Sequence, residues 1–367
     1  MTTTPIEAPR IPKTKNRGFE TAAQVEVRRF DPATDSARDD FVRSSSSASV
    51  FHLAGWRRAV ERTFGHDPRD LVAWQEGRVV GVLPLFACRS PFGKRHLIST
   101  PYGVYGGAIG ETEEIERALS DAAVAMAKAD GVGRLELRCL RAPSLDLVPS
   151  DLYATFIQPL PETTEEVWTR MPKRARAEVR KAIERHGLVL CEGEWYLDDL
   201  FEMFHDSKKG LGSPGLPKRW FENLKRELGD ACVVHLARTP DMPIAATMSF
   251  VIRDTIYFYY VGTIPDANRN FNATNYLVTR LQEWGVARHL KFFDLGRSRV
   301  GSGPYEFKKH QGFEPTPLHY RYALVKSASL PSFNPSNPKT ERLRTTWTKL
   351  PSWMTKSLSS ALMRYLP

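Results

Sequence analysis

Apolar and polar residues follow a pattern along the chain that occurs twice. In the first half, apolar positions recur at helical spacing over Ala54–Thr63. Two β-branched, apolar runs at 71–74 and 79–87 then flank a short polar turn, which is typical of a hairpin. A glycine-rich stretch at 102–110 leads into an amphipathic helix and a strand at 134–140. This order predicts one α/β unit.

The second half repeats the order, with elements that we expect at 220–228, 233–237, 244–252, 255–261, 275–288 and 289–295. Trp56 and Trp220 are 164 positions apart, and so are Gly81 and Ala245. A repeat of this length indicates a duplicated domain, because the repeats of solenoids span only about 20–50 residues. The fold class we expect is therefore α/β, as two tandem domains with mixed central sheets flanked by helices.

The composition divides the chain of 367 residues into four segments. We expect a disordered basic arm without the apolar core of a signal peptide, two domains, and a Pro/Ser-rich linker that leads into a basic amphipathic tail. Their predicted bounds are 1–23, 24–160, 161–326 and 327–367.

Two charged segments are expected to be helical. Residues 165–186 carry a narrow apolar stripe and many basic residues, Lys173 and Arg176 among them, so we expect an inter-domain helix with a basic outer face. The tail at 341–367 mixes Trp and Leu with Lys and Arg, and Pro351 would interrupt a single helix. Such a tail either lies on an anionic membrane surface or docks its apolar face on the protein body.

The net charge of +10 favours anionic partners, such as nucleic acid, acidic lipid or a phosphate-bearing substrate. The four cysteines form no CxxC pair and have no metal-binding spacing, so we expect buried reduced thiols, a cytoplasmic protein and no metal. No run of about 18 apolar residues exists to span a membrane. The basic tail could still hold the chain peripherally on the inner face of the cell membrane.

Four motifs occur in order along the chain: Lys173–Gly187 (KRARAEVRKAIERHG), Leu216–Leu224 (LPKRWFENL), Lys291–Ser298 (KFFDLGRS) and Gly303–Phe313 (GPYEFKKHQGF). They resemble motifs of the FemAB-like family of GNAT-fold acyltransferases, especially the branch found with exosortase (PEP-CTERM) and exopolysaccharide systems. The resemblance covers roughly residues 24–325 and implies two GNAT-like domains. In the family, an F-K motif lies at the transfer site, and it matches Phe307-Lys308 here. The chain lacks the long helical hairpin arm of the Gram-positive enzymes.

The resemblance implies an N-acyl- or aminoacyltransferase that acts on an amine of a cell-envelope or exopolysaccharide precursor, either a small molecule or a lipid-linked glycan or peptide. The donor would be aminoacyl-tRNA or acyl-CoA, and no cofactor would be tightly bound. One alternative is an acyl-CoA-dependent N-acetyltransferase acting on an amino sugar. Where coenzyme A users carry a glycine-rich phosphate loop, however, this chain has Arg269–Thr274, without glycines. A second alternative is a non-catalytic scaffold that binds an anionic surface.

Transfer to an amine needs a group that accepts a proton and a group that stabilises the developing oxyanion. GNAT folds hold the acyl group where two parallel strands diverge, which we expect between 257–262 and 292–295. Lys308 is our candidate for charge stabilisation and Asp294 for the base, with His310 and Glu306 as alternative bases. We expect substrate contacts from Arg297, Tyr259, Tyr260, Arg269, Tyr102, Tyr105, Lys173 and Arg176.

Overall fold

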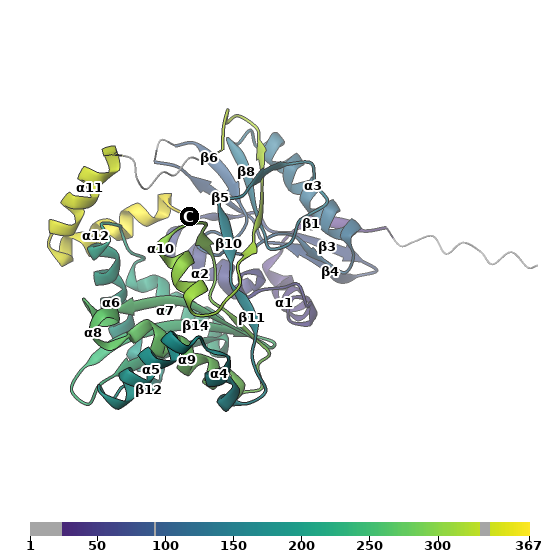
Figure 1. Cartoon of the computed structure of the whole chain (residues 1–367). Helices are drawn as coiled ribbons and strands as arrows, with labels where there is room; N and C mark the ends of the chain where they lie inside the picture. The colour runs from purple at the N-terminus through teal and green to yellow at the C-terminus, as the bar shows by residue number, and fades with distance from the viewer. Residues whose placement is uncertain (1–23, 92, 331–337) are drawn as a thin grey trace, which may run out of the picture.

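The structure is a computed structural model that describes residues 24–91, 93–330 and 338–367 (Figure 1). The arm predicted at 1–23 lies outside the described residues. Two α/β halves follow one another along the chain, and each has strands of mixed direction covered by helices. In Figure 1 the first half, purple to blue, lies above and beside the second half, teal to green. The predicted fold class is confirmed.

The first half builds two sheets, with the orders β1-β3-β4-β7 and β2-β5-β6-β8-β19-β9. The single strand predicted at 79–87 is wrong, because Pro84 and Leu85 separate β4 from β5 and these join different sheets. Proline cannot donate to a ladder, so it suits the point where a strand changes sheet. The strands are β1 (Glu26–Arg29), β2 (Asp67–Pro68), β3 (Leu71–Gln75), β4 (Arg78–Leu83), β5 (Phe86–Arg89), β6 (Arg95–Ile98), β7 (Ile109–Gly110), β8 (Arg134–Cys139), β9 (Val148–Ser150) and β19 (His319–Leu324), and the helices are α1 (Asp35–Ser44), α2 (Ala54–Phe64) and α3 (Glu113–Ala129).

The second half builds one sheet, with the order β11-β16-β15-β14-β13-β12. Its strands are β11 (Ile157–Pro159), β12 (Val189–Glu192), β13 (Cys232–Arg238), β14 (Pro243–Ile252), β15 (Thr255–Thr263) and β16 (Phe292–Asp294). The helices around it are α4 (Thr164–Arg170), α5 (Lys173–Glu184), α6 (Leu197–Gly210), α7 (Lys218–Leu228), α8 (Ala267–Phe271), α9 (Ala273–Val286) and α10 (Gly303–His310).

Two predicted elements of this half are wrong. The helix expected over 165–186 is divided into α4 and α5, since Met171, which precedes Pro172, is extended. Proline disfavours a helical conformation in the residue before it, and it then starts a new helix. The loop expected before the α9 helix contains the short helix α8.

Strands cross between the halves. Strand β19, near the end of the chain, pairs antiparallel with β8 from His319↔Cys139 to Leu324↔Arg134. Strand β11 precedes residue 160 but pairs with β16 of the second sheet. A small sheet of β17 (Ser298–Arg299), β10 (Tyr153–Thr155) and β18 (Thr316–Pro317) adds another connection. The sheets therefore exchange strands across the boundary predicted at residue 160.

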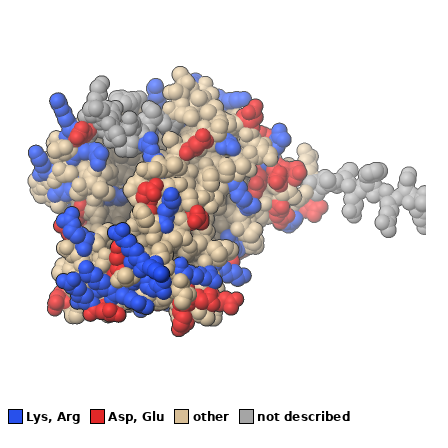
Figure 2. Space-filling view, in the orientation of Figure 1, with Lys and Arg blue, Asp and Glu red and all other residues tan. Residues whose placement is uncertain are grey.

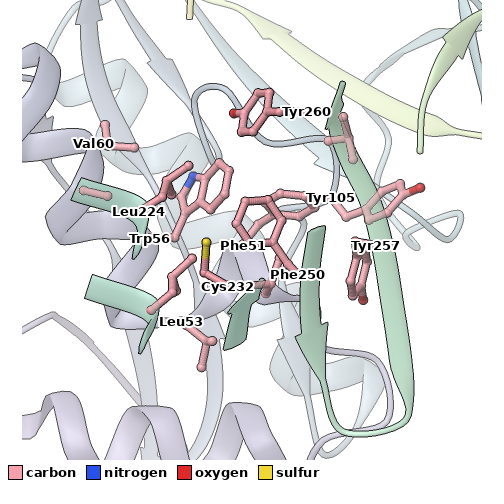
Figure 3. Close-up of a cluster of buried hydrophobic side chains, with 14 of the residues drawn as sticks. Phe51, Leu53, Trp56, Val60, Tyr105, Leu224, Cys232, Phe250, Tyr257 and Tyr260 are labelled. Carbon is pink, nitrogen blue, oxygen red and sulfur yellow. The ribbon is translucent and has the colours of Figure 1, made fainter. Parts of the chain in front are cut away.

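The repeat seen in the sequence brings equivalent helices together. Helices α2 and α7 are offset by 164 residues, and their buried indoles, Trp56 and Trp220, meet edge to face with ring centroids 5.3 Å apart. Phe51 and Phe250 pack on the same group, so both halves contribute to one cluster (Figure 3). The two domains thus share a hydrophobic core rather than meeting through a polar surface.

The tail forms α11 (Pro338–Lys349) and α12 (Ser352–Leu362), which are separated at Pro351 as predicted. Helix α12 docks on α6 and the following loop through hydroxyl groups: Thr355 Oγ1 is 3.0 Å from Nε2 of His205, and Ser359 Oγ accepts from the backbone N–H of Gly215. Docking on the body is therefore observed. None of the described helices is long and apolar enough to cross a membrane.

Candidate functional site

Two parallel strands separate at the centre of the second sheet, as predicted. Strands β15 and β16 pair from Thr255↔Phe292 to Tyr257↔Asp294, after which β16 ends while β15 continues to Thr263. The end of a strand that has lost its neighbour exposes backbone groups and projects side chains into the gap. Asp294 stands at this point.

The carboxyl group of Asp294 is fully buried where the two halves meet. Its Oδ1 accepts hydrogen bonds from the backbone N–H of Gly296 (2.6 Å) and from the hydroxyl of Tyr105 (3.1 Å). Thr155 of β10 lies at 3.5 Å and also contacts the Tyr105 hydroxyl. The first half, through Tyr105, therefore helps to hold a carboxylate of the second half.

The second oxygen of Asp294, Oδ2, is buried without a hydrogen-bond partner among the described residues. Burial raises the pKa of Asp294 to about 6, although the Gly296 N–H, the Tyr105 hydroxyl and the Lys308 charge each act to lower it. An unpaired carboxylate oxygen inside a protein is costly, and such atoms mark places where a proton or a ligand belongs. Oδ2 is therefore positioned to accept a proton near neutral pH.

Lys308 lies on α10, next to the same strand end. Its ammonium group donates to the carbonyl oxygens of Gly296 (2.8 Å) and Arg297 (3.3 Å) and lies 5.3 Å from the centre of the Phe156 ring. Burial lowers the pKa of Lys308 to about 8, although the charge of Asp294 opposes this shift. At neutral pH the site thus holds one positive and one negative group.

Arg297 adds a second cation with neutral partners. Its guanidinium donates to the hydroxyl of Tyr320 (3.0 Å) and stacks 4.4 Å over the ring of Tyr153. Tyr320 in turn donates to the carbonyl of Val104 in the first half. Since no described carboxylate pairs with Arg297, its charge remains available for an anionic group of a substrate.

Tyr102, Tyr105 and Tyr259 lie close together at the domain boundary. The hydroxyl of Tyr259 donates to the carbonyl of Tyr102 (2.8 Å), and the hydroxyl of Tyr102 donates to the carbonyl of Met363 in the tail (3.0 Å). Tyr102 has a positive φ of 62°. These contacts join the glycine-rich loop, β15 and the tail.

The structure separates four other candidates from this cluster. Tyr260 points into the core, where its hydroxyl accepts from the indole of Trp220 (2.9 Å). Glu306 and His310 are exposed on α10, and Arg269 is exposed on α8. Of the predicted acid–base groups, the strand end therefore brings together Asp294 and Lys308.

Helix α5 presents a basic face near α10. Lys173 is exposed and Arg176 is half-buried. Pro172, at the start of α5, lies against Gly312, just after α10. Figure 2 shows Lys and Arg side chains gathered over this face, between α5 and α10. The face can receive a phosphate-rich molecule beside the strand end.

Three backbone amides at the corner before α9 are engaged within the protein. The N–H groups of Asn270 and Asn272 bond to the carbonyls of Asp266 and Asn268, and that of Thr274 bonds to the side-chain oxygen of Asn268 (2.9 Å). A pyrophosphate bound at a helix N-terminus needs such amides to be available. Arg269 itself pairs with Asp266.

Sequence reasoning missed Thr155, Tyr153, Tyr320 and Arg138 as neighbours of the site. Arg138 is a buried charge on β8 that donates to Glu136 and lies opposite Tyr320 of β19, which accepts from Arg297. The strand predicted at 134–140 contains Arg138, and an arginine among the apolar residues of such a strand could have indicated a buried functional charge. Thr155 and Tyr153 gave none, because only the strand exchange brings them to Asp294 and Arg297.

Comparison with known proteins supports the fold. Residues 169–309 match the family described as an acetyltransferase (GNAT) domain. The solved structure of FemX superposes with a TM-score of 0.62 at 13% identity, over 82% of this chain and 98% of FemX. L-PGS from Bacillus licheniformis gives 0.51 at 14% identity, over 88% and 98% of the two chains.

A tandem GNAT protein from the clavulanic acid biosynthesis pathway gives a TM-score of 0.51 at 13% identity, over 84% of this chain and all of that one. A search of curated proteins by sequence found no match. At these identities the solved structures show a shared fold, two GNAT units in tandem.

Proposed function

We propose that this chain, which is built from two GNAT folds, is a FemAB-like acyltransferase that transfers an acyl or aminoacyl group to an amine of a cell-envelope or exopolysaccharide precursor. The observation that carries the proposal is the pair formed by Asp294 and Lys308 where β15 and β16 separate. A proton acceptor and a cation at one strand end are the two groups that amide formation requires.

The reaction follows from the positions of these groups. The amine nitrogen attacks the carbonyl carbon of the donor, and its proton passes to Asp294, whose Oδ2 is free. The ammonium of Lys308 stabilises the negative charge that develops on the carbonyl oxygen. When the bond to the donor oxygen or sulfur breaks, the leaving group takes that proton from Asp294, which restores the carboxylate.

The basic face of α5 supports a phosphate-rich donor such as aminoacyl-tRNA. The engaged amides before α9 disfavour coenzyme A, whose pyrophosphate would need them. Arg297 suits a phosphate or carboxylate of the acceptor, since its fork has neutral partners only. A lipid-linked or nucleotide-linked precursor carries such a group.

Donor identity can be tested by thermal melting of the full chain with aminoacyl-tRNA, uncharged tRNA and acetyl-coenzyme A in parallel. A ligand at 100 times its Kd adds roughly 2.7 kcal/mol to the free energy of unfolding. A larger shift with charged than with uncharged tRNA supports the proposal, and Lys308→Ala should remove the difference. A response to acetyl-coenzyme A instead assigns an amino-sugar N-acetyltransferase. If no ligand shifts the melting temperature, and Asp294→Ala and Lys308→Ala leave the protein's function in cells unchanged, the chain is a non-catalytic scaffold.

A further inference from the structure

The tail leaves its large apolar side chains in solvent. Leu343 of α11 is 71% exposed and Trp353 of α12 is 70% exposed. Leu358, Leu362 and Leu366 are each more than 40% exposed. A helix that docks on its own protein normally buries such residues, since burial of an apolar side chain is favourable.

Docking of α12 uses its polar side instead. At 100° per residue, Trp353 lies about 160° from Thr355 and about 120° from Ser359, whereas Leu358 and Leu362 border the docked face. Thr355 and Ser359, which bond to α6 and the loop after it, are buried. The amphipathic pattern of the tail is therefore not explained by its contact with the body.

Basic side chains surround this apolar surface. Residues 341–367 contain five Lys or Arg and one acidic residue, a net charge of +4. Arg342 and Lys349 are exposed. Leu211, 62% exposed, continues the surface onto the body, where its carbonyl accepts from Arg344.

We propose that this tail surface, formed by Leu343, Trp353, Leu358, Leu362 and Leu366, inserts into the interface of an anionic lipid bilayer. Exposed Trp and Leu beside Lys and Arg match the apolar boundary and the negative headgroups of such a membrane. A protein partner fits less well, because lysine is depleted in protein–protein interfaces. Binding needs neither donor nor acceptor, so the inference stands independently of the transfer reaction.

The test is flotation of the full chain with vesicles of phosphatidylcholine alone or mixed with phosphatidylglycerol, at low and high salt. We expect binding to the anionic vesicles, weakened by salt. The double variant Leu343→Ser/Trp353→Ser should lower the partition coefficient about tenfold or more. Arg342→Glu/Lys349→Glu should remove the preference for anionic lipid.

Trp195→Ser is the matched control, because Trp195 is 72% exposed on the second domain, outside the tail. It should bind like the unmodified chain, and melting curves should show all variants folded. Failure of the unmodified chain to float with anionic vesicles, or unchanged flotation of Leu343→Ser/Trp353→Ser, would overturn the proposal. So would sedimentation showing a dimer that this double variant dissociates, since the surface would then belong to a second copy.

Discussion

At the scale of single residues, the site depends on burial more than on direct ion pairing. Burial raises the pKa of Asp294 and lowers that of Lys308, so both move toward neutrality. The two groups come from different parts of the chain, Asp294 from a strand end and Lys308 from a short helix. Groups that titrate near the working pH are the most efficient proton carriers, as the proposed transfer requires.

Replacing Asp294 by Asn should slow transfer and stabilise the fold. The folded pKa lies above the ordinary value of 3.8, so the wild-type protein loses stability as the pH rises from about 4 to about 6. Asn removes this loss, which is about 1–3 kcal/mol at neutral pH. Urea unfolding should therefore show the variant more stable at neutral pH and the difference vanishing below about pH 4, while turnover falls about 100-fold or more. Equal stability at both pH values would contradict the buried charge.

The pH–rate profile of transfer should be bell-shaped. It should rise as Asp294 ionises near pH 6 and fall as Lys308 loses its proton near pH 8. Lys308→Arg, which stays charged, should remove the alkaline limb from what activity remains. The control is Lys309→Ala, an exposed neighbour that should keep both limbs. An alkaline limb that persists in Lys308→Arg would assign it to another group.

At the scale of elements, the candidate site is positioned by the end of a strand and by the division of a helix. Strand β16 ends at Asp294, and α5 begins at Lys173 because Pro172 terminates the preceding segment. The basic face is therefore a separate helix beside α10 rather than part of a longer connector. Its cations are surface groups, whose contribution to a partner's affinity should depend on salt.

Reversing two charges on α5 should weaken a phosphate-rich donor without affecting chemistry. Lys173→Glu/Arg176→Glu should reduce the slope of log affinity against log salt by about 1–2. Filter binding of tRNA over a salt series measures this slope. Lys94→Glu, an exposed lysine of the first half, should leave it unchanged. If Lys94→Glu alters the slope as much as Lys173→Glu/Arg176→Glu does, tRNA binding depends on the net charge of the protein and not on the basic face of α5.

Local patterns predicted most elements, prolines at 84 and 172 divided two of them, and long-range pairing decided the neighbours of the site. The predicted helix at 54–63 is observed at Ala54–Phe64, and the strand at 134–140 at Arg134–Cys139, because each is fixed by its own periodicity. The neighbours of Asp294 could not be predicted in this way. Thr155 reaches it only because β10 runs between β17 and β18, which is a matter of topology.

At the scale of the whole molecule, the two halves form one folding unit. The sheet that contains β8 takes β19 from beyond residue 160, the sheet of the second half takes β11 from before it, and the cluster around Trp56 and Trp220 includes both halves. Relative motion of the two domains would disrupt this core. Coupling between them is thus built into the hydrophobic interior.

A fragment of residues 24–160 should therefore not fold alone. It lacks β19, leaves the edge of β8 unpaired, and exposes the Trp56 cluster. Circular dichroism and limited proteolysis should show it unfolded or aggregated, whereas co-expression with residues 161–367 should restore a protected complex. A soluble, cooperatively melting 24–160 fragment would show that the exchanged strand is dispensable.

The late position of β19 also affects how the protein is made. A ribosome that has finished β8 at Cys139 must add 185 more residues before Leu324 completes the partner strand. At ordinary elongation rates this takes about 10 to 40 seconds. During that time the nascent chain has an open β edge, so its yield in the cell should depend on chaperones that cover such edges.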